Sequence, residues 1–280
     1  MFLITGANGQ LGTCLQDILP AEQLVLTDVN ELDITDEKAV LNFGNKYPLS
    51  AIINCAAYTN VDKAESEPEL ARKINALGPA NLAKLAALKD VPMVHISTDY
   101  VFDGTAHTPI PETAPVNPLG VYGKTKREGE ESVLQYAKTA VILRTAWLYS
   151  PYGKNFVKTM LKLGLEHSEL KVVADQFGTP TYGPHLARAI VDILPQIKPG
   201  TKEIYHFTDE GTATWYDLAY YTLKCTKSAC NVLPIHTADY PTPAQRPAFS
   251  VLDKTKFKTI FAKSLPHWTQ GVEACLKKLS

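Results

Sequence analysis

Apolar and polar positions divide the first half of the chain into short strands alternating with longer helices. Continuous apolar runs predict buried strands at residues 1–5, 24–27, 51–57, 93–97 and 140–144. Apolar residues at helical spacing predict helices at residues 13–19, 37–46, 68–88 and 122–136. Such alternation predicts an α/β fold of the Rossmann type, a doubly wound parallel sheet with helices on both faces.

The texture of the chain changes after Trp147. Residues 151–156 and 175–184 are rich in Gly, Pro, Asn and aromatic residues, and residues 240–247 contain three prolines. A helix at 186–194 and a strand at 204–207 indicate a return to the sheet. We therefore expect a dinucleotide-binding domain at 1–148 and 184–210, and a smaller, discontinuous substrate-binding lobe at 149–183 and 211–280.

A glycine turn joins the first strand to the first helix. Gly6, Gly9 and Gly12 have the spacing G-x-x-G-x-x-G, which matches the dinucleotide fingerprint G-x-G-x-x-G only in part. Glycines allow a pyrophosphate to approach backbone N–H groups. The turn therefore predicts phosphate binding, although an ordinary strand-to-helix turn is an alternative.

The second strand ends at Asp28, where an acidic side chain would accept hydrogen bonds from an adenosine ribose. No Arg or Lys follows until Lys38, so the charge around Asp28, Glu31 and Asp33 favours NADH over NADPH. Asp28 is also suited to a turn, and Asp33 or Asp36 to a helix cap.

Tyr122 and Lys126 stand four residues apart on a predicted helix, and Thr98 lies upstream of them. Residues at positions i and i+4 share one helix face. We expect the Lys126 ammonium to lower the pKa of Tyr122, so that the phenol exchanges a proton with a carbonyl or alcohol oxygen. A Tyr and a Lys at this spacing are more often surface residues, so the preceding motifs give the pair its weight.

Composition narrows the function classes. The chain has 28 basic and 29 acidic residues without a charge run, which argues against nucleic acid or an anionic membrane as partner. There is no apolar span long enough for a membrane helix, and the start lacks a basic leader, so we expect a cytoplasmic protein. Five scattered cysteines without a C-x-x-C pair indicate free or buried thiols and no metal site. We expect His95 to be a packed core residue.

Seven segments together resemble a known family. They identify the chain as similar to the extended short-chain dehydrogenase/reductases, and within them to the dTDP-4-dehydrorhamnose reductase family. The matching segments are residues 5–12, 54–65, 97–104, 122–126, 144–149, 175–181 and 246–247 with 250–253.

The resemblance implies reduction of dTDP-4-dehydro-L-rhamnose to dTDP-L-rhamnose by hydride transfer from NADPH or NADH. Tyr122 would supply the proton, Lys126 would hold the nicotinamide ribose, and Thr98 would donate a hydrogen bond to the same substrate oxygen. Implied cofactor contacts, besides Tyr122 and Lys126, are Gly6, Asn8, Gly9, Gln10, Leu11, Asp28, Asp33, Ile34, Ala56, Ala57, Tyr58 and Asn75. Implied dTDP-sugar contacts are Thr98, Asp99, Tyr100, Trp147, Asn155 and Arg246.

Several points stay open at the level of sequence. A purely structural role for Trp147 fits equally well. Some family members have a glutamate-rich, metal-linked dimer surface, but Glu128, Glu130 and Glu131 are more simply a solvated helix face, so magnesium and a homodimer are left open. Two alternative functions remain: reduction of another nucleotide-linked 4-keto-6-deoxysugar, or a non-catalytic NADP-binding subunit like that of methionine adenosyltransferase.

Overall fold

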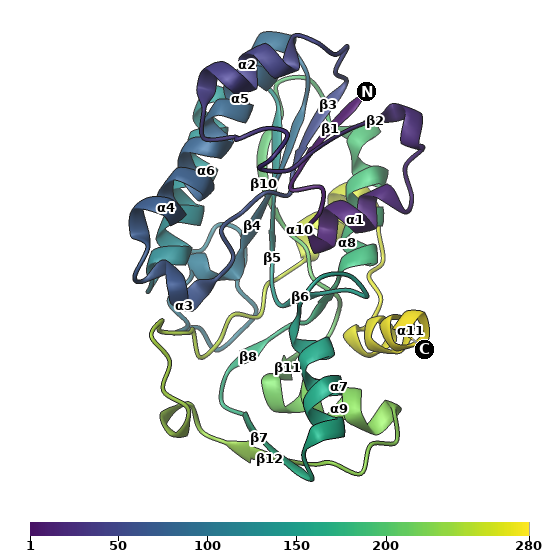
Figure 1. The fold of residues 1–280 in the computed structure, drawn as a ribbon. Coiled ribbons are helices and arrows are strands. Elements are labelled where there is room, and N and C mark those ends of the chain that lie inside the picture. The colour runs from purple at the N-terminus through teal and green to yellow at the C-terminus, as the bar shows by residue number, and fades with distance from the viewer. Residues whose placement is uncertain (280) are drawn as a thin grey trace.

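The computed structural model describes residues 1–279 and places a six-stranded parallel sheet in the upper part of the molecule (Figure 1). The strand order is β10-β5-β4-β3-β1-β2. The strand β2 is added on one side of β1 and β3 on the other, so the order of the strands reverses at β1. Open α/β sheets bind ligands at the carboxyl ends of the strands beside such a reversal. The strands are β1 (Phe2–Thr5), β2 (Leu24–Thr27), β3 (Ala51–Asn54), β4 (Met93–Thr98), β5 (Ala140–Thr145) and β10 (Lys202–His206).

Helices cover both faces of this sheet, as the alternating pattern predicts (Figure 1). One face packs against α2 (Glu37–Gly44), α5 (Gly78–Lys89) and α6 (Val121–Tyr136) through a cluster that includes Val40, Leu82 and Val133. The other face packs against α1 (Gln10–Gln16), α8 (Gly183–Ile193) and α10 (Thr255–Phe261). The central strands β3 and β5 are buried along their whole length, which explains their uninterrupted apolar sequences. The Rossmann-type α/β fold is confirmed.

A second group of elements lies below the carboxyl ends of the strands in Figure 1. It contains three two-stranded sheets, β6 with β9, β7 with β12 and β8 with β11, together with three helices. Two further apolar clusters hold this group together. Where the boundary between two domains falls stays a prediction. The elements are β6 (Leu148–Tyr149), α7 (Phe156–Glu166), β7 (Glu169–Val173), β8 (Phe177–Gly178), β9 (Thr181–Tyr182), β11 (Ala213–Thr214), α9 (Trp215–Cys225), β12 (Asn231–Ile235) and α11 (Trp268–Leu279).

Several elements differ from their predicted bounds. The strand β3 ends at Asn54 and not at residue 57, α2 ends at Gly44 and not at residue 46, and α8 begins at Gly183 and not at residue 186. The helix α1 spans Gln10–Gln16 and not residues 13–19, because Gly9 already serves as its N-cap residue. The helix predicted at 68–88 consists of α4 (Pro68–Arg72), a π-helical turn (Lys73–Leu77) and α5. Asp36 is the cap of α2, where its side chain accepts a hydrogen bond from the Ala39 amide. Short connecting elements are α3 (Val61–Ala64) and 3-10 turns at Ala21–Gln23, Asp99–Val101, Leu194–Gln196 and Thr237–Asp239.

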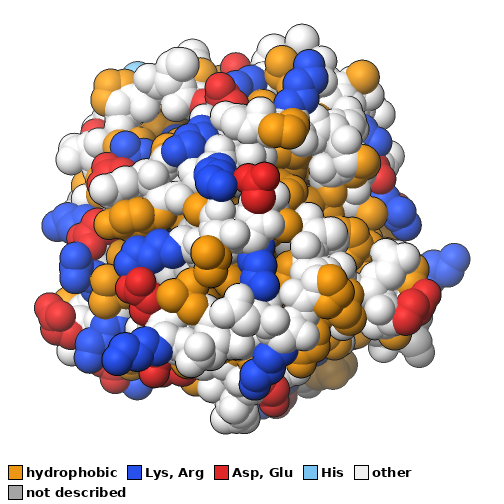
Figure 2. Space-filling model, turned by 90° about the horizontal axis from the view of Figure 1, so that it is seen from above, with side chains coloured by type: hydrophobic (Ala, Val, Ile, Leu, Met, Phe, Trp, Pro, Cys, Tyr) orange, Lys and Arg blue, Asp and Glu red, His pale blue; other side chains and the backbone are white. Residues whose placement is uncertain are grey.

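The distribution of surface charge and the state of the cysteines are as the sequence predicts. Viewed from above, Lys and Arg side chains are interspersed with Asp and Glu, without a patch of a single charge (Figure 2). All five cysteines are free thiols, and His95 is fully buried. Within residues 1–279, no helix is both long and apolar enough to cross a bilayer.

Candidate active site

A cavity of about 730 Å³ opens at the carboxyl ends of the central strands. The glycine turn, the ends of β3, β4 and β5, and one face of α6 form its walls on the sheet side. Trp147, residues 153–155 and Trp215 close it from the second group of elements. Its volume suits a dinucleotide or a nucleotide sugar better than a small metabolite.

The glycine turn is packed too tightly for any side chain at two of its positions. Gly6 has φ +66°, and a Cβ atom there would lie 2.7 Å from Cα of Ala56. A Cβ atom on Gly12 would lie 2.4 Å from the Gly6 carbonyl oxygen. Gly6 therefore lets the turn pack against the loop after β3, and Gly12 lets α1 pack against the turn, which leaves Gly6, Gly9, Gln10 and Leu11 along the cavity wall.

Acidic and apolar residues surround the other end of the cavity. Asp28 accepts hydrogen bonds from the amides of Asn8 at 3.1 Å and Val29 at 2.8 Å. Asp33 accepts one from the Thr35 amide at 2.9 Å. A carboxylate has further lone pairs, so Asp28 keeps the capacity to accept hydrogen bonds from a ribose diol. Val29, Leu32 and Ile34 line the same region and provide apolar surface for a base.

Small residues after β3 form the adjoining wall. Ala56 and Ala57 line the cavity. Tyr58 and Asn75 are not part of its lining, and the Asn75 side chain instead binds both the amide and the carbonyl of Tyr58, at 2.8 and 3.1 Å. Asn75 is fully buried in the π-helical turn. The structure therefore gives Asn75 the task of holding the 56–58 loop.

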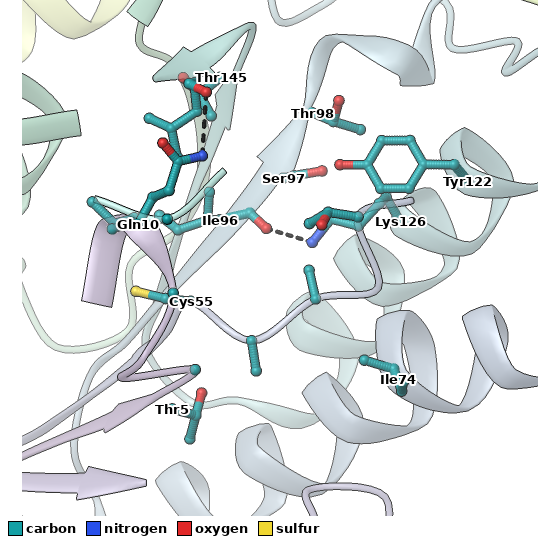
Figure 3. A pocket seen from close by; sticks show the side chains of 18 of the residues that line it. Thr5, Gln10, Cys55, Ile74, Ile96, Ser97, Thr98, Tyr122, Lys126 and Thr145 are labelled. Carbon is teal, nitrogen blue, oxygen red and sulfur yellow. Dashed lines mark hydrogen bonds between the residues drawn. The ribbon is translucent and has the colours of Figure 1, made fainter. Parts of the chain in front are cut away.

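Tyr122 and Lys126 project from α6 into the same cavity, opposite Thr98 at the end of β4 (Figure 3). The Tyr122 oxygen points toward Ser97 and Thr98 (Figure 3). Lys126 donates a hydrogen bond of 2.6 Å to the Ile96 carbonyl. The three predicted catalytic residues therefore line the same part of the cavity.

The prediction for the pKa of Tyr122 was wrong. Burial raises this pKa to about 12, and interaction with the Thr98 hydroxyl offsets the increase only in part. Lys126 does not lower it noticeably, because the ammonium is turned toward the Ile96 carbonyl. The phenol is therefore neutral and protonated near neutral pH, which is the form that donates a proton.

Lys126 itself is nearly inaccessible to solvent. Burial lowers its pKa to about 8, and the negative charge of Glu130 one turn along the helix opposes this shift. Cys55 and His95 also lie near the Lys126 ammonium. Burial holds the pKa of His95 well below its usual value, so His95 is neutral and does not add a second positive charge beside Lys126. Lys126 is therefore still mostly an ammonium at neutral pH.

Asp99 lies beside Thr98 at the cavity wall. It is 1% exposed, accepts a hydrogen bond from the Thr98 hydroxyl at 3.1 Å, and has a pKa raised to about 6 by burial. Tyr100 lines the same wall and meets the Tyr122 ring edge to face, with 5.7 Å between the ring centroids. Both residues border the place where Tyr122 presents its hydroxyl.

The comparison with known proteins places the chain in a family. Its residues 1–280 match the model of the RmlD substrate binding domain family. The chain is 41% identical to dTDP-4-dehydrorhamnose reductase of Aggregatibacter actinomycetemcomitans, covering 97% of this chain and 96% of that protein. The chain belongs to the dTDP-4-dehydrorhamnose reductase family.

Solved structures agree with this family membership. A dTDP-4-dehydrorhamnose reductase of Clostridium acetobutylicum has a TM-score of 0.95 at 44% identity, covering 99% of each chain. The enzyme of Bacillus anthracis, solved in complex with NADP, has a TM-score of 0.95 at 37% identity, covering 99% of this chain and 98% of that one. The UDP-glucose 4-epimerase of Thermus thermophilus, at 19% identity and TM-score 0.84, shares the fold.

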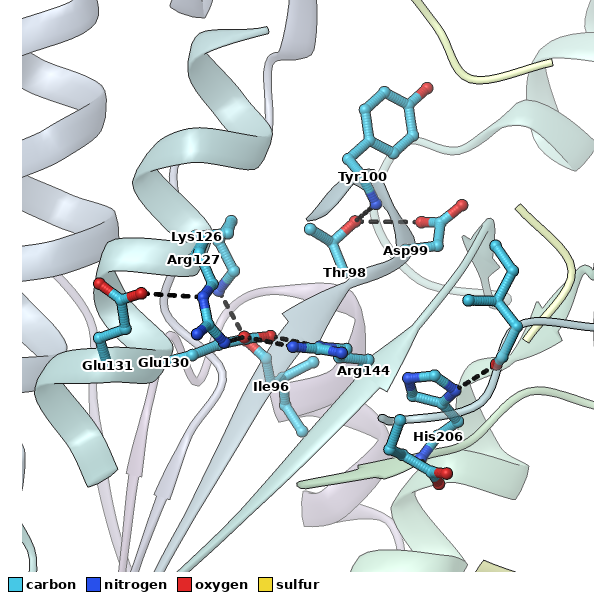
Figure 4. A network of polar contacts seen from close by, with 12 residues as sticks. Ile96, Thr98, Asp99, Tyr100, Lys126, Arg127, Glu130, Glu131, Arg144 and His206 are labelled. Atoms are coloured by element: carbon cyan, nitrogen blue, oxygen red, sulfur yellow. Dashed lines mark hydrogen bonds and ion pairs between the residues drawn. The ribbon is translucent and has the colours of Figure 1, made fainter. Parts of the chain in front are cut away.

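In this member of the dTDP-4-dehydrorhamnose reductase family, the predicted surface position of Glu130 was wrong. Glu130 is fully buried, not on a solvated face, and forms two hydrogen bonds of 2.7 Å to Arg144 on β5 (Figure 4). It also accepts one from Arg127 at 3.0 Å. Glu128 and Glu131 do pair at the surface, with Arg72 and Arg127. Three glutamates within four residues point in different directions around a helix, and the sequence alone does not reveal which of these directions is buried.

Two tryptophans form the wall opposite α6. Trp147 and Trp215 stack with their rings 3.6 Å apart at 10°, and both line the cavity. Trp147 has φ +48°, and Gly178 packs against its indole ring so closely that a Cβ atom would lie 2.7 Å away. Trp215 was not predicted as a site residue, because 68 positions separate it from Trp147 in the sequence and nothing local marks the pair.

Two predicted ligand contacts are engaged by other residues of the protein, and a third lies outside the cavity lining. Arg246 forms an ion pair with Asp62, with 2.8 Å between Nη2 and Oδ2, and does not line the cavity. Asn155 lines the cavity, but its amide binds Gln10 at 3.0 Å and its oxygen caps α7. Asn8 is exposed outside the lining. Their roles as ligand contacts stay predictions, and among residues 1–279 no cluster of His, Cys, Asp and Glu is arranged to hold a metal ion.

Proposed function

We propose that this chain is an NAD(P)H-dependent reductase that converts dTDP-4-dehydro-L-rhamnose to dTDP-L-rhamnose. The observation that carries the proposal is the convergence of Tyr122, Lys126 and Thr98 on one cavity in a member of the dTDP-4-dehydrorhamnose reductase family. The cavity fits a dinucleotide, because the glycine turn leaves its backbone uncovered along the cavity wall and the loop after β3 lines the cavity only with small side chains.

The bound dinucleotide would supply the hydride. Tyr122, protonated because its pKa is about 12, would give its proton to the C4 oxygen as negative charge develops there. Thr98 would donate a hydrogen bond to the same oxygen, a contact that strengthens only as the charge forms. Reduction of the ketone by one hydride and one proton yields the alcohol, so atoms and charges balance.

Lys126 would keep its ammonium near the phenol and the nicotinamide ribose. Its hydrogen bond to Ile96 fixes the amine at the end of β4. Ala56 and Ala57 would leave room for the dinucleotide, while Asp28, Asp33 and Ile34 would border its adenosine. Gly6, Gly9, Gln10 and Leu11 would border its diphosphate, and Asp99, Tyr100 and Trp147 would contact the dTDP-sugar.

The test is incubation of the purified protein with NADPH or NADH and dTDP-4-dehydro-L-rhamnose, followed by identification of the product by NMR. The expected product is dTDP-L-rhamnose. Another configuration at C4 would assign a different nucleotide-linked sugar to the same chemistry. Oxidation of no NAD(P)H at all would favour the non-catalytic alternative.

The variant Tyr122→Phe separates binding from chemistry. It should bind the dinucleotide as the wild type does and lose about a hundredfold or more in turnover, the usual effect of a positioned general acid. Unchanged turnover would remove Tyr122 from the mechanism. The control Tyr136→Phe changes the exposed tyrosine at the end of the same helix and should keep full activity.

We infer a cytoplasmic location, since a nucleotide sugar and NAD(P)H are both found there, and localisation of a tagged chain by fractionation would test it. A homodimer is tested by light scattering of the purified protein. A monomeric mass would remove the dimer from the proposal without affecting the chemistry.

A further inference from the structure

The cavity has few positive charges for the anions that it is proposed to hold. Among its lining residues only Lys126 and Lys154 are cationic, against Asp28, Asp33 and Asp99. Lys126 is buried, bound to the Ile96 carbonyl and located beside Tyr122. It therefore serves the reactive end of the cavity, and one cation remains for the rest.

Lys154 lies at the glycine turn because its neighbours contact Gln10. The amide nitrogen of the Asn155 side chain lies 3.0 Å from the Gln10 side-chain oxygen, and the Ser150 hydroxyl lies 3.0 Å from the same oxygen. Gly153 has φ +59°, and a Cβ atom there would lie 3.1 Å from Cγ of Gln10. The segment that carries Lys154 is thus fixed against Gln10 of the glycine turn.

The Lys154 side chain itself has no protein partner. It is exposed, and within the described part of the chain it makes neither a hydrogen bond nor an ion pair. Lys158 and Lys162 on α7 differ, since Lys158 donates to the Pro151 carbonyl and Lys162 pairs with Glu166. An ammonium on a flexible stem at a cavity wall is free to meet an anion.

We propose that Lys154 binds the diphosphate of the dinucleotide at the glycine turn, an inference that rests on the proposed function. The turn offers backbone amides but no charged side chain of its own, and α1 is only seven residues long with no basic residue nearby in sequence. Lys154 reaches this turn from the second group of elements. It thereby joins the two sides of the cavity when the dinucleotide is bound.

Direct binding measurements test the proposal without any turnover. NADPH, NADH and dTDP are titrated separately into the wild type, Lys154→Met and Lys154→Arg at low and high salt. Lys154→Met should weaken NADPH and NADH by the same factor, about tenfold at low salt, and should make binding less salt-dependent. Lys154→Arg should restore most of the affinity, while dTDP binding stays as in the wild type.

The matched control is Lys162→Met, which removes the same charge from the outer side of α7. It should bind all three ligands as the wild type does. Unchanged dinucleotide affinity in Lys154→Met would overturn the proposal. So would a loss confined to NADPH, which would assign Lys154 to the 2′-phosphate, or a loss confined to dTDP, which would assign it to the nucleotide sugar. A wild type that binds neither dinucleotide would first overturn the proposed function.

Discussion

Glu130 on α6 and Arg144 on β5 meet through two parallel hydrogen bonds of 2.7 Å, with both side chains almost completely buried. The fork of the guanidinium matches the two carboxylate oxygens, which is the strongest geometry for such a pair. Arg144 also lies over the Phe102 ring, 5.2 Å from its centroid. The pair joins the helix that carries Tyr122 and Lys126 to the central sheet.

We expect Glu130→Gln to destabilise the protein by about 3–5 kcal/mol, because Arg144 would keep its charge without a compensating carboxylate. Urea unfolding followed by circular dichroism measures the change. Glu131→Gln, one position further and exposed, should change the free energy of unfolding by less than about 0.5 kcal/mol. Equal effects of the two variants would contradict this account.

The rate should depend on the protonation of Lys126. Its pKa is lowered to about 8, so the ammonium is present below this pH and is lost as the pH rises through it. We expect kcat/KM to decrease above about pH 8, whereas Tyr122, with a pKa of about 12, stays protonated over the same range. Lys126→Arg should lose activity but remove the decrease, since arginine keeps its charge. A wild-type profile that remains level well above pH 8 would contradict the assignment.

Asp99 should make stability depend on pH in the direction opposite to most carboxylates. Its folded-state pKa of about 6 is above the ordinary value of 3.8, so the folded state binds the proton more tightly. The contribution of Asp99 to the free energy of unfolding is therefore fully present below pH 3.8 and is lost as the pH rises through about 6. Asp99→Asn should be more stable than the wild type above pH 6, by on the order of 3 kcal/mol, with little difference in acid. Thermal unfolding across this range measures it.

The control for this effect is Asp103→Asn. Asp103 is at the surface, and hydrogen bonds from Thr105 lower its pKa. Its replacement should bring no gain in stability at neutral pH. A gain as large as that of Asp99→Asn would mean that overall charge, and not burial, is the cause.

Gly178→Ala should disturb the sugar side of the cavity without affecting the dinucleotide. A methyl group there would lie 2.7–2.9 Å from atoms of the Trp147 indole, which must then move from its stack with Trp215. We expect the KM for the dTDP-sugar to rise about tenfold, with dinucleotide affinity unchanged. Gly200→Ala adds a methyl where no atom lies within 4 Å but at φ +82°, so it should cost stability and, outside the cavity lining, leave both constants unchanged. An unchanged KM in Gly178→Ala would argue against a role for Trp147 in sugar binding.

Local patterns predicted most of the central domain. The strands β2, β4 and β5 and the helix α6 lie within one or two residues of their expected bounds, because their periodicity and their end signals are continuous in the sequence. Tyr122, Lys126 and Thr98 come from elements whose ends meet in any parallel sheet of this kind.

What the sequence could not predict depends on tertiary distance and burial. The stack of Trp147 with Trp215 and the ion pair of Asp62 with Arg246 join residues far apart in the chain. The pKa of Tyr122 was misjudged because spacing on a helix reveals neither how deeply a phenol is buried nor where a neighbouring ammonium turns. Desolvation is a property of the assembled site.

The π-helical turn before α5 carries a consequence for the length of the chain. It holds one more residue per hydrogen-bonded ring than an α-helix does, and Asn75 sits inside it. Deleting a single residue from this turn would leave a regular α-helix whose two halves keep nearly the same orientation, because the remaining residues complete an ordinary α-helical turn. Only the bulge would be lost, and with it the position from which the Asn75 side chain reaches the Tyr58 amide, so the deletion would release the 56–58 loop while leaving the helix itself intact.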